Sequence, residues 1–184
     1  MADLTQTART SPLTGRHGGS GVAQLSAASP ASRISLRSRP EAVSALSAAL
    51  GLDLPVKPKT SAVAGARLAF WLGPDEWLVI DESGADLMAL CAGAGVVHSA
   101  TDVSHRNTAI IVSGPGAAAA VNGGCSQDLS LAVFPVGACS RTLFGKAEVV
   151  LYRPAPDTFR VEVWRSFAGY AFGLLAEGAE DAAL

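Results

Sequence analysis

Charged residues are scarce in this sequence. Asp, Glu, Lys and Arg account for 16% of the 184 residues, against about 25% in ordinary soluble domains. The formal net charge is −2 and the chain has no run of Lys or Arg, which excludes the basic footprint of nucleic-acid or anionic-membrane binding. Apolar residues reach 49%. This imbalance reflects either the abundance of small alanines and glycines or a permanent partner, because the cores of obligate interfaces are depleted of charged residues.

Cysteine is also scarce. Cys91, Cys125 and Cys139 are odd in number and form no C-x-x-C pair, so neither a disulfide framework nor a zinc ribbon is predicted. We expect reduced, mostly buried thiols. Cys125 or Cys139 paired with His105 as a base would form a nucleophilic site. No local motif indicates such a site, and the commoner role of a free cysteine is that of a small buried hydrophobic residue.

The spacing required for a metal site is missing. The histidines are His17, His98 and His105, and they match neither H-E-x-x-H nor the His/Cys spacings of metal sites. Residues 1–10 contain Asp3 and no apolar segment typical of a secretory signal. No uninterrupted apolar stretch approaches the roughly 20 residues of a membrane span. We therefore predict a soluble cytoplasmic protein that binds neither a metal nor a membrane.

The first 30 residues differ in composition from the rest. They are rich in Ser, Thr, Gly and Ala and show no apolar period, which predicts a disordered N-terminal tail over residues 1–30. Residues 31–184 have the length of a single domain that folds on hydrophobic burial alone. The alternation in residues 32–37 predicts the first strand, with Ile34 and Leu36 on one face.

Periodicity and turn residues divide the remaining chain into helices and strands. Helices are expected from Pro40 to Gly51, over about 84–92 with Ser83 or Asp81 as N-cap, over 116–121, and after Ser166 with Phe167, Tyr170, Ala171, Leu174 and Leu175 on the buried face. Strands are expected as a hairpin over 67–72 and 77–80, as a second pair over 96–103 and 108–112, and over 139–143, 148–152 and 159–164. This order predicts an α+β fold with mainly antiparallel sheets.

Two polar segments each allow a functional and a structural interpretation. Residues 113–116 (SGPG) precede a helix whose N–H groups can hold an anion, although a proline-initiated strand-to-helix turn explains the segment equally well. Asp102, His105 and Arg106 form the most polar cluster in an apolar region. A carboxylate near a guanidinium can orient a substrate, but turn stabilisation is the commoner role of such residues.

Tryptophan and arginine supply the candidate interface residues, because both types are enriched at binding hot spots. Trp71 and Trp77 lie on apolar strands and are expected to fill the core. Trp164 lies at a strand end beside Arg165. Trp164, Arg165 and Arg106 are therefore the predicted interface residues.

Four stretches resemble the gamma subunit of heterotetrameric sarcosine oxidase. They are residues 72–78 (LGPDEWL), 101–106 (TDVSHR), 139–147 (CSRTLFGKA) and 163–168 (VWRSFA). The likeness extends from about Ile34 to Leu175, which is nearly all of the predicted folded region. The last two motifs, in this order and at this chain length, are fairly specific.

That subunit is similar in fold to the folate-binding domain of the glycine-cleavage T-protein family. The matching stretches are residues 102–104, 110–115 and 145–153. In the active relatives an aspartate on the strand after the glycine assists folate and one-carbon chemistry, whereas Ala147 and Glu148 stand near that place here. Catalytic geometry must hold within about 1 Å, so this departure argues against independent folate chemistry.

The resemblance implies a non-catalytic structural subunit. The complex would demethylate sarcosine oxidatively to glycine, with formaldehyde or 5,10-methylenetetrahydrofolate and hydrogen peroxide as further products. FAD, FMN, NAD and tetrahydrofolate would belong to the partner alpha, beta and delta subunits, and no catalytic residue or cofactor is expected on this chain. Two alternatives remain open. One is a freestanding tetrahydrofolate-binding or aminomethyltransferase-like protein with Glu148, Asp102 and Arg106 as ligand contacts, and the other is an assembly factor that leaves after flavin insertion.

Overall fold

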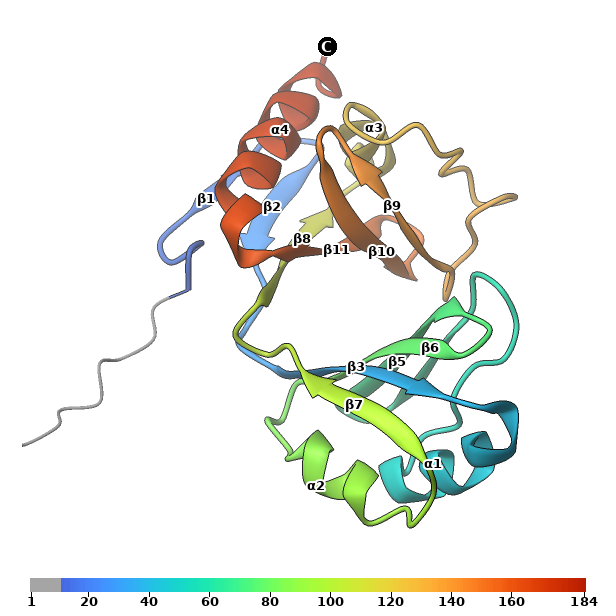
Figure 1. Cartoon of the computed structure of the whole chain (residues 1–184). Coiled ribbons are helices and arrows are strands. Elements are labelled where there is room, and N and C mark those ends of the chain that lie inside the picture. The colour runs from blue at the N-terminus through green and yellow to red at the C-terminus, as the bar shows by residue number, and fades with distance from the viewer. Residues whose placement is uncertain (1–10) are drawn as a thin grey trace, which may run out of the picture.

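The computed structural model describes residues 11–184, which form two antiparallel β-sheets with helices on their outer faces (Figure 1). The six-stranded sheet has the order β1 (His17–Gly19), β2 (Gln24–Ala27), β8 (Asn107–Ser113), β11 (Thr158–Trp164), β10 (Ala147–Ala155) and β9 (Cys139–Phe144). The five-stranded sheet has the order β4 (Ser61–Ala64), β5 (Arg67–Gly73), β6 (Glu76–Asp81), β3 (Ser32–Ser38) and β7 (His98–Asp102). The helices are α1 (Val43–Leu50), α2 (Leu87–Ala92), α3 (Ala117–Asn122) and α4 (Ala168–Asp181), and short 3-10 turns at Pro40–Ala42 and Arg165–Phe167 precede α1 and α4. This architecture confirms the predicted α+β class with antiparallel sheets.

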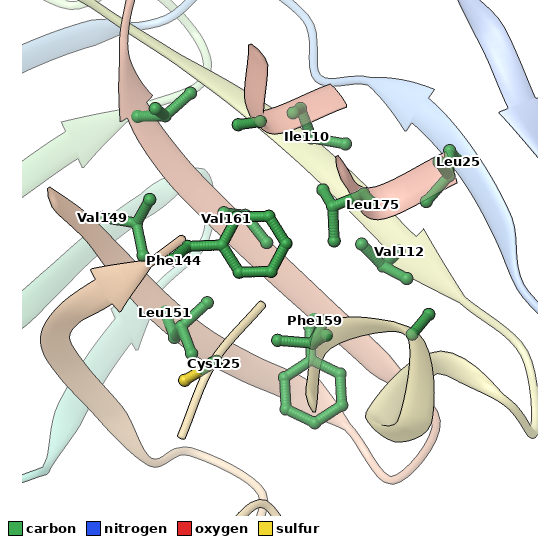
Figure 2. Close-up of a cluster of buried hydrophobic side chains, with 14 of the residues drawn as sticks. Leu25, Ile110, Val112, Cys125, Phe144, Val149, Leu151, Phe159, Val161 and Leu175 are labelled. Carbon is green, nitrogen blue, oxygen red and sulfur yellow. The ribbon is translucent and has the colours of Figure 1, made fainter. Parts of the chain in front are cut away.

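The largest apolar cluster lies between the six-stranded sheet and helices α3 and α4. Alternate residues of β8, β10 and β11 point into it, as expected for a sheet with one covered face. Figure 2 shows Phe144, Val161 and Leu175 packed together at its centre. Gly178 allows α4 to lie close to α3, since a Cβ at this position would lie only 2.4 Å from the carbonyl oxygen of Ala120.

Two further clusters build the other half of the molecule. The first lies between the five-stranded sheet and helices α1 and α2, and Trp77 is 1% exposed within it and donates its indole N–H to the carbonyl oxygen of Pro55. The second lies between the facing sheets, where the rings of Phe70 and Tyr152 are 4.7 Å apart. The sheets are therefore joined by a packed apolar layer of their own.

The prediction of a disordered tail over residues 1–30 is wrong for the part that the structure describes. Strand β2 pairs with β8 in an antiparallel ladder, and β1 pairs with β2. Leu13 and Leu25 are buried at 0% and 3% exposure in the large cluster. The edge of β8 offers hydrogen bonds that order this segment despite its weak apolar period. Residues 1–10 lie outside the described residues.

The second predicted strand pair is also wrong. Strands β7 and β8 exist near the expected residues, but β7 pairs with β3 whereas β8 pairs with β2 and β11. A hydrogen bond from the N–H of Val103 to the carbonyl oxygen of Arg33 marks the point at which the chain leaves one sheet for the other. The turn residues between β7 and β8 were interpreted as a hairpin. They instead connect two strands that follow each other in sequence but belong to different sheets.

Local signals predicted most other elements correctly. Strand β3 and the hairpin of β5 and β6 are confirmed, and so are β9, β10 and β11. Gly51 closes α1 in the left-handed conformation with φ 60°, where glycine carries no Cβ penalty. The N-cap of α2 is Asp86 rather than Ser83 or Asp81, because the Asp81 carboxylate accepts hydrogen bonds from Ser83 and Ala85 and pairs with Arg67. Strand β4 was not predicted.

Candidate functional site

Strand pairing brings the three predicted interface residues together. Trp164 ends β11 and lies opposite Asn107, the first residue of β8. The guanidinium carbon of Arg106 lies 4.4 Å from the centre of the Trp164 ring, which is the geometry of a cation–π contact. The backbone N–H of Arg165 donates to the carbonyl oxygen of Arg106 at 2.7 Å. We call the corner formed by Arg106, Trp164 and Arg165 the arginine–tryptophan corner.

A compact turn positions Arg106 at this corner. The carboxylate of Asp102 accepts a hydrogen bond from the backbone N–H of Ser104 at 2.8 Å. The backbone N–H groups of Arg106 and Asn107 both donate to the carbonyl oxygen of Val103, at 3.1 and 3.0 Å. Of the two interpretations of this polar cluster, the structure supports turn stabilisation for Asp102.

An exposed row of aromatic side chains continues from the corner along α4. Trp164, Phe167 and Tyr170 are 39%, 39% and 42% exposed, and the first two rings are 6.5 Å apart. Phe167 and Tyr170 were expected on the buried face of the last helix, and that prediction is wrong for both. The buried stripe is instead Ala168, Ala171, Phe172, Leu175, Gly178 and Ala179. Its small residues allow α4 to approach α3 closely, which a stripe of large aromatic residues would prevent.

A buried ionic network lies between the two sheets beneath the corner. Arg33 of β3 donates two hydrogen bonds to the carboxylate of Glu162 on β11, at 2.8 and 3.2 Å. Arg160 donates to the same carboxylate at 2.8 Å and reaches Glu82 at 2.6 Å. Arg33, Glu162 and Arg160 are only 2%, 1% and 5% exposed. This network links β3 in one sheet to β11 in the other.

This network was not predicted from the sequence. The available signal is the alternation in TFRVEVW of β11, where Arg160 and Glu162 occupy every second position between apolar residues. In a sheet with two covered faces, such positions place charges in the interior. The partner Arg33 is 129 positions away from Glu162, so pairing them required the tertiary fold.

A small hollow next to the network contains two of the proposed folate contacts. Its volume is about 90 Å³, and Glu148, Arg106 and Glu162 are among the residues that line it. Asp102 does not line it. This volume is well below the roughly 300–1,000 Å³ of pockets for drug-sized ligands.

The loop at residues 113–116 is occupied by the protein's own backbone. The N–H of Gly114 donates to the carbonyl oxygen of Asp157 at 2.9 Å, and the N–H of Gly116 donates to that of Val22 at 2.8 Å. The N–H of Ala117 donates to Gly114. Since these groups already have acceptors, the structure supports the strand-to-helix turn rather than an anion site.

The three thiols are all buried. Cys91 and Cys139 are 0% exposed and Cys125 is 3% exposed. Burial raises the pKa of Cys139 to about 12, and its thiol approaches the carbonyl oxygen of Thr60. Burial also raises the pKa of Cys91. Because the thiolate is the nucleophilic form, these groups act as core residues at neutral pH. His105 is exposed in the turn.

We expect iodoacetamide to leave the native protein unlabelled at neutral pH, because burial blocks access and the raised pKa of Cys139 keeps its thiol protonated. Intact-mass spectrometry after labelling in denaturant should show all three cysteines modified. Rapid modification of Cys139 in the folded protein would contradict this expectation.

Within residues 11–184 no group of three His, Cys, Asp or Glu side chains could hold a metal ion. In the same range, none of the helices has the length and apolarity needed to cross a membrane.

Comparison with known proteins identifies the family of the chain. The model of the sarcosine oxidase, gamma subunit family matches residues 37–181. Sarcosine oxidase subunit gamma from Corynebacterium sp. (strain P-1) is 29% identical over 168 residues, which cover 88% of this chain and 82% of that protein. Its counterpart from Arthrobacter sp is 33% identical over 122 residues, which cover 64% of this chain and 59% of that protein.

Two solved structures share the fold. A chain of the heterotetrameric sarcosine oxidase from Corynebacterium sp. U-96, in complex with pyrrole 2-carboxylate, matches with a TM-score of 0.88 and 24% identity, over 96% of this chain and 97% of that one. The glycine cleavage system aminomethyltransferase T from Bartonella henselae matches with a TM-score of 0.64 and 17% identity, over 89% of this chain and 47% of that one. The predicted structural resemblance to the T-protein is confirmed.

Proposed function

Because the chain belongs to the sarcosine oxidase gamma subunit family, we propose that it is a non-catalytic subunit of a heterotetrameric sarcosine oxidase. The complex demethylates sarcosine oxidatively to glycine, with formaldehyde or 5,10-methylenetetrahydrofolate and hydrogen peroxide as further products. The alpha, beta and delta subunits are its partners and carry FAD, FMN, NAD and tetrahydrofolate. The assembly operates in the cytoplasm, where the three thiols stay reduced.

The observation that carries the non-catalytic role is that the candidate reactive groups serve the fold. Asp102 holds a turn and Cys139 is a protonated core residue. The buried carboxylate of Glu162, which was not among the candidates, pairs with Arg33 and Arg160. A catalytic group must instead reach the reacting atoms of a substrate. The role that remains for this scaffold is to support neighbouring subunits.

Co-expression of this chain with the alpha, beta and delta subunits of the same organism tests the proposal. We expect all four chains to co-elute in constant stoichiometry, and we expect omission of this chain to lower the yield of active complex. The purified chain alone should not oxidise sarcosine. A monomeric chain that neither binds those subunits nor changes their activity would contradict the proposal, and a chain that leaves the finished complex would indicate an assembly factor.

A second candidate function rests on the hollow that Glu148 and Arg106 share. A carboxylate and a guanidinium that line the same hollow can hold a polar ligand, so a freestanding tetrahydrofolate-binding protein is the alternative. Calorimetric titration of the isolated chain with a reduced folate separates the two. Micromolar affinity that is lost in Glu148→Gln would favour this alternative, whereas the volume of the hollow leads us to expect no binding there.

A further inference from the structure

The arginine–tryptophan corner borders a shallow basic hollow. It has a volume of about 480 Å³ and is lined by Pro12, His105, Arg106, Trp164, Arg165 and Ser166. A second hollow of about 220 Å³ shares Pro12, His105 and Arg165 with the first. Two arginines and a histidine, but no Asp or Glu, line the first hollow within residues 11–184. The lining of this hollow thus includes two guanidinium groups, although the whole chain has a net charge of −2.

The corner is held in one geometry before any partner binds. Arg106 lies against the face of Trp164, and the backbone bond from Arg165 to Arg106 fixes the two segments to each other. Trp164 is further fixed by its place opposite Asn107 in the sheet. Side chains that are already ordered lose less conformational entropy on association, and the corner therefore suits an interface hot spot.

The exposed aromatic row adds apolar surface beside this hollow, because Trp164 belongs to both. Trp164 and Phe167 keep 39% of their surface exposed, and Tyr170 keeps 42%. Tryptophan, tyrosine and arginine are the residue types that dominate binding energy at protein interfaces. A basic hollow next to an aromatic row calls for a carboxylate beside an apolar side chain, because the guanidinium fork matches a carboxylate in two hydrogen bonds.

We propose that the arginine–tryptophan corner is the docking site for an acidic segment of a partner subunit, with an Asp or Glu carboxylate at Arg106 and an adjacent apolar side chain on the aromatic row. This inference rests on the proposed function, since it names the chemistry by which the chain joins its complex. The hollow accommodates a few side chains, so the corner is one hot spot within a larger interface.

Charge reversal at Arg106 tests the inference in the co-expressed complex of all four subunits. We expect Arg106→Glu to weaken retention of this chain by at least about tenfold, and Trp164→Ala to have a comparable effect, because truncated hot-spot residues have effects of this size. The control is Arg39→Glu. Arg39 is exposed and follows the last residue of β3, whereas Arg33 lies near the start of that strand. This substitution makes the same charge change outside the corner, and we expect binding to stay unchanged.

Salt dependence provides a second measurement. Wild-type affinity should fall as ionic strength rises, and Arg106→Gln should bind more weakly with a smaller salt dependence. Circular dichroism and thermal unfolding check that each variant is folded. The inference is overturned if Arg106→Glu binds within about twofold of wild type or if Arg39→Glu weakens binding equally. If the wild-type chain itself fails to join the complex, the proposed function is wrong as well. If the wild-type chain joins the complex but the variants behave as described above, only the docking site is wrong.

Discussion

Substitution of Glu162 by glutamine is expected to lower the free energy of unfolding by about 3–5 kcal/mol, because breaking a buried ion pair leaves an uncompensated charge in the interior. The Glu162 carboxylate accepts hydrogen bonds from Arg33 and Arg160, and all three side chains are almost fully buried. Glutamine has a similar shape but no charge. The two guanidinium groups would then repel each other between the sheets.

Chemical denaturation at constant pH and salt measures this effect. The matched control is Asp75→Asn, which also converts a carboxylate to an amide in a pair with an arginine. The pair of Arg37 and Asp75 is 57% and 51% exposed in its side chains, so the control should leave stability nearly unchanged. If both variants lose the same free energy of unfolding, burial is not the reason that the Glu162 ion pairs stabilise the protein. A single transition in the wild-type protein would support the prediction that the two sheets belong to one domain.

Two glycine-to-alanine substitutions in the same helix are expected to change stability in opposite directions. A Cβ at Gly178 would lie 2.4 Å from the carbonyl oxygen of Ala120, so Gly178→Ala must push α4 away from α3. The expected loss is about 1–3 kcal/mol, the usual cost of overpacking. A Cβ at Gly173 meets nothing within 4 Å, and Gly173→Ala should gain up to about 1 kcal/mol from helix propensity.

The pair of variants is its own control, since the helix and the chemical change are identical. Thermal and denaturant unfolding should rank Gly173→Ala above wild type and Gly178→Ala below it. If Gly178→Ala is as stable as Gly173→Ala, the close approach of α4 to α3 is not required for packing.

Short-range patterns predicted the elements whose signals are local. The alternation at Ile34 and Leu36 and the position of Gly51 each specify one strand face or one helix end without reference to distant residues. The partners of β2 and β7 could not be predicted in this way. Hydrogen bonds to β8 and β3 decide their places, and these pairings depend on segments far away in the sequence.

The candidate site likewise contains some residues that local sequence patterns predicted and others that only the tertiary fold brings together. Residue type and strand-end position indicated Trp164 and Arg165, and the structure places Arg106 against the former. The network around Glu162 was missed because one of its arginines comes from the other sheet. The buried face of α4 was predicted correctly at Ala171 and Leu175 but not at Phe167 and Tyr170. More than one stripe satisfies the helical period, and the packing of α4 against α3 selects the one that contains Gly178.

The order of strands along the chain has a consequence for biosynthesis. All strands of the five-stranded sheet lie consecutively between Ser32 and Asp102, whereas β2 and β8, which pair with each other, flank this block. Because β3 and β7 are hydrogen-bonded neighbours, the block begins and ends at one place. The ribosome makes the whole block before β8, so β2, which pairs locally with β1, must wait for its other partner. The block is thus an insertion between two paired strands. Because Arg33 and Phe70 of the block pack against Glu162 and Tyr152, its inner face is covered only after β10 and β11 have been made.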